Sequence, residues 1–353
     1  MTLGIFLGIG ESLSQMEKSG QTGRFINSYL RRYAKDFRKV YLFSYADESY
    51  KLPGNVILVA NKYHMHRYLY APLLPIVNLR QVLECNVIRG FGLTSAIPAF
   101  FIFKPFTFNW PYDYAQFLRI EKKYLLIPIF KILEILAFLK ADKVFVATKI
   151  KLKKLRGQKY IFIPNGVDQS IFKEQGSRKK GLVFVGRFEK QKNLFFLIDA
   201  VSNLPAKFRS ITFIGSGPQE EALTKYSLKK GVVLKIIAPV THLKLPELLR
   251  RFSIFTFPSL AEGSPKVLLE AMALGLVPVV TNFSTAREIV ASGKNGYVTT
   301  YNVDDYSQRL ESLLSDDGLT KKISESAKLS IAKNFSLEHL LTDEIKALHE
   351  IVK

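Results

Sequence analysis

Short apolar runs recur along the first half of the chain, and segments of helical periodicity separate them. The runs are rich in β-branched and aromatic residues, and they occupy residues 2–7, 38–43, 55–60, 86–89 and 143–147. Strands that alternate with helices in this way are typical of a parallel sheet. The pattern predicts a Rossmann-like α/β domain over residues 1–170.

The alternation restarts at Gly181. The strand-like runs that follow are GLVFVGR, SITFIGS, VVLKII, IFTFPS and LVPVVT. Such a restart predicts a second doubly wound domain, whose ligands should bind beyond the carboxyl ends of its strands. We assign this domain to residues 181–335 and the polar segment 171–180 to the linker.

The last segment, residues 336–353, has apolar residues at helical spacing, among them Leu337, Leu341 and Ile345, with Ser336 as a candidate N-cap. An amphipathic terminal helix needs an apolar surface to cover. We expect it to pack back toward the N-terminal domain.

The chain is strongly basic, with 51 Lys and Arg against 30 Asp and Glu and a net charge of +21. The excess is greater in the first half, which also carries Tyr63, Tyr68 and Tyr70, three aromatic side chains expected to be exposed. This balance favours an anionic membrane face or an anionic lipid-linked acceptor. Two alternatives are a basic surface that only aids solubility and a nucleic-acid-binding protein, although no RNA- or DNA-binding module is recognisable.

Cys85 is the single cysteine and cannot form an internal disulfide, which fits a reducing compartment. The N-terminal residues lack the basic region of a signal peptide and predict a strand instead. The apolar segments 91–103 and 124–139 are too short or too charged to span a bilayer. We expect a cytoplasmic protein, peripheral on the inner face of the membrane.

Residues 254–281 combine the features of a ligand site. A buried strand is followed by the loop 258–263, Ser264 is placed to cap a helix that has Pro265 in its first position, and Gly275 is placed to end that helix. Free backbone N–H groups at a helix start, here those of Lys266 and Val267, suit a phosphate. From spacing alone, a capped helix with two solvated glutamates explains the segment equally well.

Glu262-x7-Glu270, in EGSPKVLLEAMALGLVPVV, resembles the signature of the family-four retaining glycosyltransferases. FVGRFEKQKNLFFLIDAV is similar to that family's phosphate-binding segment, FIGSGPQEEAL to its glycine-containing turn, and IPNGVD to the segment before the interdomain linker. These motifs cover most of residues 160–300.

The resemblance implies the GT-B fold, an α/β architecture of two Rossmann-like doubly wound domains that face each other across a cleft. It also implies site residues. Arg187 and Lys192 would hold the donor diphosphate, Glu262 would orient the sugar, and Glu270 would hold the ribose. Further donor contacts would come from Gly263, Ser264, Lys266, Val267, Gly215 and Ser216.

The N-terminal domain matches the family less closely. We interpret EKSGQTGRFINSYL, with Gly20 and Gly23, as a variant of the family's first βα loop, where glycines let the backbone approach the donor phosphates. Asp113 lies where family members often present a histidine to the reacting sugar, so it is a candidate catalytic residue.

The implied reaction is transfer of a sugar from a UDP- or GDP-sugar to a saccharide or lipid-linked glycan, with retention of configuration and without a metal ion or a bound cofactor. Cell-surface polysaccharide, lipopolysaccharide or glycolipid synthesis would use such an enzyme. An alternative on the same fold is a nucleotide-sugar enzyme with another reaction, such as an epimerase or a phosphorylase.

Overall fold

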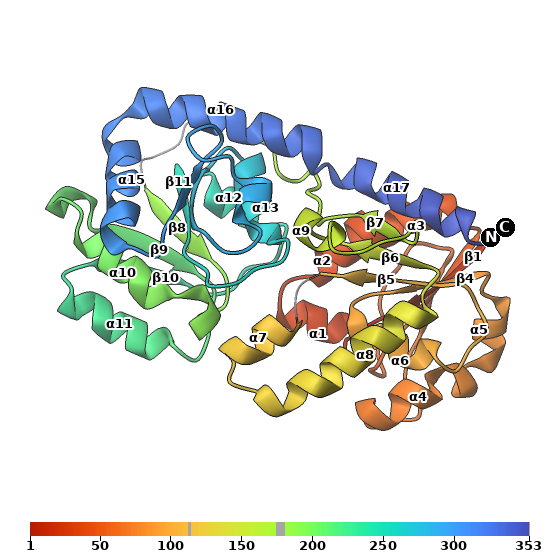
Figure 1. The fold of residues 1–353 in the computed structure, drawn as a ribbon. Coiled ribbons are helices and arrows are strands. Elements are labelled where there is room, and N and C mark those ends of the chain that lie inside the picture. The colour runs from red at the N-terminus through yellow and green to blue at the C-terminus, as the bar shows by residue number, and fades with distance from the viewer. Residues whose placement is uncertain (112–113, 174–180, 353) are drawn as a thin grey trace. The chain divides into compact units, whose positions relative to one another are not determined.

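The computed structural model describes residues 1–111, 114–173 and 181–352 (Figure 1). The chain divides into two compact units. Unit 1 comprises Met1–Ala115, Tyr124–Pro164 and Glu338–Lys353, and unit 2 comprises Gln116–Lys123 and Asn165–Leu337. Most of the predicted linker, residues 174–180, lies outside the described residues.

The described residues of unit 1 form a seven-stranded parallel sheet with the order β3-β2-β1-β4-β5-β6-β7. Its strands are β1 (Thr2–Phe6), β2 (Lys39–Phe43), β3 (Val56–Val59), β4 (Val87–Gly90), β5 (Phe106–Trp110), β6 (Lys143–Val146) and β7 (Tyr160–Phe162). β1 lies in the middle and is buried along its whole length, as expected for a strand that helices cover on both faces.

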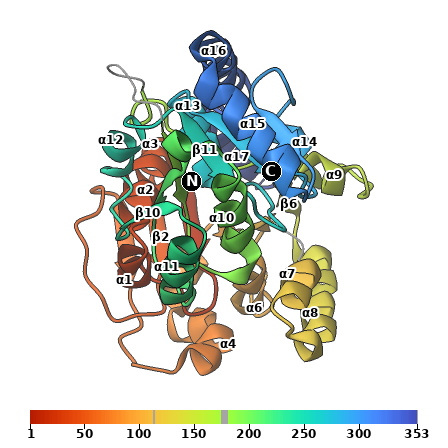
Figure 2. The same ribbon diagram turned by 90° about the vertical axis from the view of Figure 1, so that its left-hand side faces the viewer.

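Helices lie on both faces of this sheet. The first helical segments are α1 (Leu13–Lys18), α2 (Thr22–Arg24), the π-helix η1 (Phe25–Leu30) and α3 (Arg31–Asp36). Later ones are α4 (Arg67–Val77), α5 (Leu79–Glu84), η2 (Leu93–Ser95), α6 (Ala96–Ala99), η3 (Tyr124–Leu126), α8 (Ile127–Lys140), α9 (Lys149–Leu152) and α17 (Leu337–Glu350). α3 and α17 lie together on one face, and α4, α6 and α8 lie side by side on the other (Figures 1 and 2).

A buried polar cluster joins α17 to unit 1. Arg89 on β4 donates to Glu344 of α17 through Nε at 2.7 Å and through Nη2 at 3.2 Å. The Tyr33 hydroxyl of α3 donates to the same carboxylate, and all three side chains are buried. A chain segment that is distant in sequence therefore completes the packing of this unit.

Unit 2 contains a six-stranded parallel sheet of order β10-β9-β8-β11-β12-β13. The strands are β8 (Leu182–Val185), β9 (Ser210–Ile214), β10 (Val233–Ile237), β11 (Ile254–Phe257), β12 (Val277–Thr281) and β13 (Tyr297–Thr299). β8, β11 and β12 are central, and their near-continuous apolar sequences are those of strands buried on both faces.

The helices of unit 2 surround this sheet. They are η4 (Lys190–Lys192), α10 (Leu194–Ser202), η5 (Ala206–Phe208), α11 (Glu220–Lys229), α12 (Leu245–Leu249), α13 (Lys266–Ala273), α14 (Ala286–Ile289), α15 (Val303–Ser315) and α16 (Asp317–Asn334). α7 (Tyr114–Ile120) has residues in both units. In the part of the chain that the structure describes, no helix is both long and apolar enough to cross a bilayer.

The predicted fold class, two Rossmann-like doubly wound domains, is confirmed, and the strands read from apolar runs appear in order. β13, α15 and α16 were not predicted. A local signal for the two helices exists, because Asn302 caps α15 by accepting from Asp305 N and Asp316 caps α16 by accepting from Leu319 N. The three residues of β13 are too few to show a strand period.

Candidate functional site

The loop that follows β11 is held by its neighbours. Leu260 N donates to the Gln191 carbonyl at 2.9 Å, and Gln191 Nε2 donates to the Ala261 carbonyl at 2.5 Å. On the other side, Thr285 Oγ1 donates to the Gly263 carbonyl at 2.6 Å. The loop is therefore fixed between η4 and the start of α14, which positions Glu262 at the carboxyl end of the sheet.

Lys192 and Glu262, two residues predicted from separate motifs, are in contact. Lys192 Nζ lies 2.5 Å from Glu262 Oε1, and the two side chains are only 14% and 10% exposed. The Nζ atom also lies 5.2 Å from the centroid of the Phe257 ring. A cation and a carboxylate thus meet beyond the ends of β8 and β11, where an open α/β sheet binds its ligands.

Arg187 follows β8 in the same loop as Lys192 but is much more accessible. Its side chain is 70% exposed and pairs with Glu189 at 3.1 Å. Because surface ion pairs of this kind are weak, the guanidinium can exchange Glu189 for an anionic ligand at little cost. The end of β8 thus carries one cation held by Glu262, Lys192, and one accessible cation, Arg187.

Helix α13 begins at Lys266, and the prediction that Ser264 caps it with Pro265 in the first helical position is wrong. Pro265 is the N-cap residue and the helix has no side-chain cap. The Ser264 hydroxyl instead accepts from Asn165 N at 3.1 Å. The reason is tertiary, since the IPNGVD segment that contains Asn165 lies against this loop and occupies the hydroxyl.

The predicted end of α13 is confirmed. Gly275 has φ of 81° and its N–H donates to the Met272 carbonyl, while Leu276 N donates to the Ala271 carbonyl at 2.9 Å. These two hydrogen bonds form a Schellman motif, which needs a left-handed residue that glycine supplies without strain. The helix therefore runs from the candidate site back along the sheet.

Glu270 is buried on α13 and paired with a residue that sequence analysis missed. His242 Nε2 and Glu270 Oε1 lie 3.0 Å apart, and both side chains are less than 5% exposed. The His242 ring also packs on Phe172, with centroids 5.0 Å apart. His242 lies just beyond the short loop that follows β10. In the sequence, its only signal is that it is a polar residue near the carboxyl end of a strand.

Gly215 and Gly217 allow two loops to touch. A Cβ atom at Gly215 would lie 2.0 Å from the Gly186 carbonyl oxygen, and one at Gly217 would lie 2.6 Å from Phe188 N. Phe188 N donates to the Ser216 carbonyl at 2.9 Å. The GSG turn thus fixes the loop that carries Arg187, a packing role that these glycines fulfil with or without a ligand contact.

The segment with Gly20 and Gly23 does not follow β1 directly, because helix α1 lies between them, and its expected contact with the donor phosphates stays a prediction. β1 ends at Phe6, and Ser12 caps the intervening helix α1 by accepting from Gln15 N at 3.0 Å. Gly20 follows α1, with φ of 70°, and Gly23 lies within α2. The capping residue Ser12 in the sequence ESLSQ is a local signal that would have predicted the start of α1. The other candidate of this unit, Asp113, lies outside the described residues.

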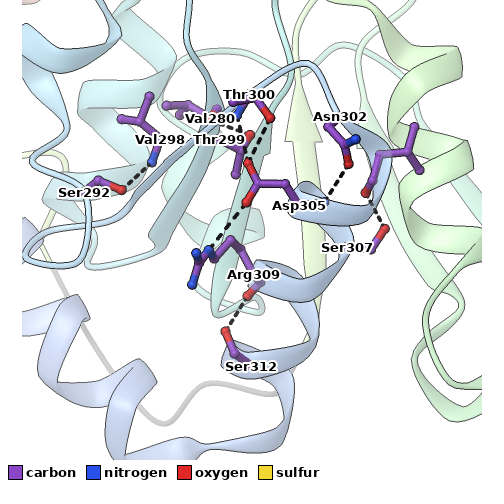
Figure 3. Close-up of polar contacts among 11 residues, drawn as sticks. Val280, Ser292, Val298, Thr299, Thr300, Asn302, Asp305, Ser307, Arg309 and Ser312 are labelled. Carbon is purple, nitrogen blue, oxygen red and sulfur yellow. Dashed lines mark hydrogen bonds and ion pairs between the residues drawn. The ribbon is translucent and has the colours of Figure 1, made fainter.

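A pocket of about 380 Å³ lies elsewhere in unit 2, at the β12–β13 edge of the sheet. Its polar groups hold the first turns of α15 in place. Asp305 accepts from Thr300 N at 2.9 Å and pairs with Arg309 at 3.7 Å (Figure 3). None of the predicted site residues lines it. The candidate site is therefore the cluster at the ends of β8, β10 and β11.

Two doubly wound parallel sheets define a Rossmann-like α/β protein, and the second carries its charged cluster at the strand ends where such proteins bind nucleotides. Residues 167–330 match the family described as glycosyl transferases group 1. This segment is the one in which the motifs were found, and the match confirms the resemblance read from them.

Two curated relatives illustrate the match. The uncharacterized glycosyltransferase MJ1178 of Methanocaldococcus jannaschii is 27% identical over 216 residues, which cover 60% of either chain. The UDP-Gal:alpha-D-GlcNAc-diphosphoundecaprenol alpha-1,3-galactosyltransferase of Escherichia coli is 28% identical over 207 residues, or 53% of either chain. The alignments thus span less than two thirds of the length of these relatives.

A likeness to solved structures extends over the whole chain. Anabaena HepE in complex with UDP and glucose superposes with a TM-score of 0.75 over 99% of this chain and 100% of the other, at 17% identity. At that identity the likeness concerns the fold alone. The fold is that of the GT-B glycosyltransferases.

Proposed function

We propose that the chain is a retaining glycosyltransferase that moves a sugar from a UDP- or GDP-sugar to a saccharide or lipid-linked glycan. The observation that carries this proposal is the contact between Lys192 and Glu262 beyond the ends of β8 and β11, with Arg187 in the same loop. One relative is named for a UDP-sugar donor and a diphosphoundecaprenol acceptor, and one structural neighbour was solved with UDP and glucose.

Each group has a role in this proposal. A departing diphosphate gathers negative charge, which Lys192, Arg187 and the backbone N–H groups of Lys266 and Val267 stabilise. Since these donors supply the positive charge, no metal ion is required. Gly263, Ser264, Gly215 and Ser216 form the loops around the donor, and Glu262 accepts hydrogen bonds from sugar hydroxyls.

Glu270 holds the ribose of the donor, and His242 fixes its carboxylate. A buried carboxylate keeps a defined orientation only if its neighbours hold it, and the 3.0 Å contact with His242 provides such a hold.

The proposed acceptor is membrane-associated, and the chain works at the inner face of the cell membrane. The support is the charge of +21 and the lipid-linked substrates named for relatives, among them the Campylobacter jejuni alpha-1,4-N-acetyl-D-galactosaminyltransferase that acts on a diphospho-undecaprenol-linked saccharide. An anionic bilayer attracts such a basic protein.

A thermal-shift screen of UDP-, GDP- and ADP-sugars tests the donor, because a ligand that binds only the folded state raises the melting temperature. Sugar transfer is then measured for the Lys192→Met and Arg187→Met variants. Loss of a charge that stabilises the transition state lowers turnover by about 100-fold or more. Full activity after treatment with a chelator is expected.

Lys190→Met is the matched control, since Lys190 is exposed in the same turn as Lys192. Its turnover should equal that of the wild type. Equal turnover in the Lys192→Met and Arg187→Met variants would refute the diphosphate assignment, and a screen without any stabilising nucleotide sugar would refute the proposed function itself.

A further inference from the structure

Helix α8 is apolar on two opposite sides. Its inner side packs on the core of unit 1 through Phe130, Leu133 and Phe138. Its outer side exposes Ile132, Ile135, Leu136 and Leu139, at the i, i+3, i+4, i+7 spacing of a helical stripe. A surface helix needs only one apolar stripe to pack on the core. The outer stripe therefore indicates that α8 binds a second partner.

Further exposed apolar side chains lie on the neighbouring elements of unit 1, and of the three tyrosines expected at the surface Tyr63 and Tyr68 are exposed while Tyr70 is buried. Leu125 in η3 is 90% exposed and Phe103, which follows α6, is fully exposed. α4, α6 and α8 lie side by side (Figures 1 and 2). We call the following exposed side chains the apolar face: Tyr63, Tyr68, Leu69, Ile76, Leu79, Leu83, Phe101, Phe103, Tyr124, Leu125, Leu126, Ile129, Ile132, Ile135, Leu136 and Leu139.

Unit 2 has no comparable surface among its described residues. Its exposed large apolar side chains are few and lie on separate elements, such as Leu228 on α11, Val233 on β10 and Leu329 on α16. Scattered single residues of this kind are normal, whereas a large contiguous apolar patch marks an interaction site. The apolar face is therefore a specific feature of unit 1.

Exposed cations accompany the apolar face. Lys131 lies on α8 itself, Arg80 on α5, and Lys62 and Arg67 lie at the start of the segment that contains α4. The carboxylate of Glu84 on α5 pairs with both Lys39, at 2.8 Å, and Arg80, at 3.9 Å, so the cations outnumber it. An apolar surface among cations complements an anionic lipid surface, whereas a second copy of this chain would oppose like charges.

We propose that the apolar face docks on an anionic phospholipid bilayer, with the outer stripe of α8, Leu125 and Phe103 inserted among the acyl chains. Tyr63, Tyr68 and Tyr124 lie at the headgroup level, where an apolar ring and a polar hydroxyl are both satisfied. α8 lies in the plane of the interface, as amphipathic segments that do not span a membrane do. This docking surface rests on the proposed function, in which the chain works at the inner face of the membrane.

The test is sedimentation of the full chain with vesicles of phosphatidylglycerol and phosphatidylcholine. In the Ile135→Gln/Leu139→Gln variant we expect the partition coefficient to fall at least about tenfold, because two large apolar side chains no longer enter the bilayer. The matched control is Leu228→Gln/Leu329→Gln, which changes two helix-surface leucines of unit 2 that are 75% and 69% exposed. It should sediment like the wild type.

Several results would overturn the proposal. One is equal partitioning of the α8 variant and the wild type. Another is wild-type binding to pure phosphatidylcholine vesicles that equals its binding to the anionic vesicles. A third is a wild-type dimer in light scattering that the α8 substitutions convert to a monomer. Thermal stabilisation by UDP-, GDP- and ADP-sugars is measured on the same preparations. If no nucleotide sugar has an effect while vesicle binding depends on α8, the proposed function fails and the docking surface stands.

Discussion

Glu270 and His242 show how one residue acquires its setting from another that is distant in the chain. Glu270 belongs to a recognisable spacing with Glu262, whereas His242 belongs to no motif. Their side chains meet at 3.0 Å in the interior of unit 2. The contact orients the carboxylate of Glu270, as the proposed contact with the donor ribose requires.

The His242→Ala variant should bind the donor nucleotide about tenfold more weakly, since a hydrogen bond to a charged group typically contributes about 1.5–3 kcal/mol. The measurement is the concentration of UDP that gives half-maximal thermal stabilisation. His339→Ala serves as the control, because His339 is exposed on α17. Unchanged UDP affinity of a folded His242→Ala variant would contradict the positioning role.

Cys85 gives a second prediction at this scale. Burial raises the pKa of its thiol to about 12, and Sγ donates to the Gln81 carbonyl at 3.2 Å. In an unfolded chain the pKa is about 8.5, so only the unfolded state contains much reactive thiolate at pH 8 to 9. Ellman's reagent at pH 8 should react slowly with the native protein and at once after addition of denaturant. Immediate reaction of the native protein would contradict the burial of Cys85.

At the scale of elements, the two ends of α13 differ in what determines them. Gly275 ends the helix through its own left-handed backbone, a local property that is visible in the sequence. At the start, the Ser264 hydroxyl does not cap the helix, because it accepts a hydrogen bond from Asn165 N instead. The local capping rule therefore fails at the start of α13, because a segment distant in sequence binds the Ser264 side chain.

The GSG turn predicts a strong effect of a single methyl group. In the Gly217→Ala variant the new Cβ would lie 2.6 Å from the backbone of Phe188, so the loops after β8 and β9 must separate. We expect a loss of about 1–3 kcal/mol in the free energy of unfolding, measured by urea denaturation. Gly54→Ala is the control, since a Cβ at Gly54 meets nothing within 4 Å. Equal stability of the two variants would refute the packing role.

At the scale of the whole molecule, α17 returns the end of the chain to unit 1 through Glu344. The carboxylate joins Arg89 and Tyr33 in a site with almost no solvent. Burial and the neighbouring carboxylate raise the pKa of Tyr33 well above its ordinary value, so its hydroxyl remains a donor. Such a cluster stabilises the fold only while every member has its partner.

The Glu344→Ala variant should therefore lose about 3–5 kcal/mol in the free energy of unfolding, because the buried Arg89 guanidinium loses its counter-charge. Asp343→Ala is the adjacent control, since Asp343 is exposed on the same helix. Chemical denaturation followed by circular dichroism measures both. A loss below 1 kcal/mol in Glu344→Ala, or equal losses in both variants, would show that the cluster does not hold α17 in place.

Much of the fold was predictable because the strands of a parallel sheet produce short apolar runs that alternate with segments of helical periodicity. β8, β9, β10, β11 and β12 appeared where those runs occur. β13 was not predicted, because three residues carry no period, and α1 was not predicted, because only one of its six residues, Leu13, is buried.

By itself, the sequence determined the two doubly wound domains, the glycine that ends α13 and the motifs that place Arg187, Lys192, Glu262 and Glu270 near strand ends. These are local properties, carried by periodicity, backbone freedom and spacing. Only the tertiary structure decided that Lys192 meets Glu262, that His242 holds Glu270 and that α8 keeps a second apolar stripe exposed. Contacts between distant segments and the exposure of a surface depend on how the elements pack, which the order of residues along one element does not record.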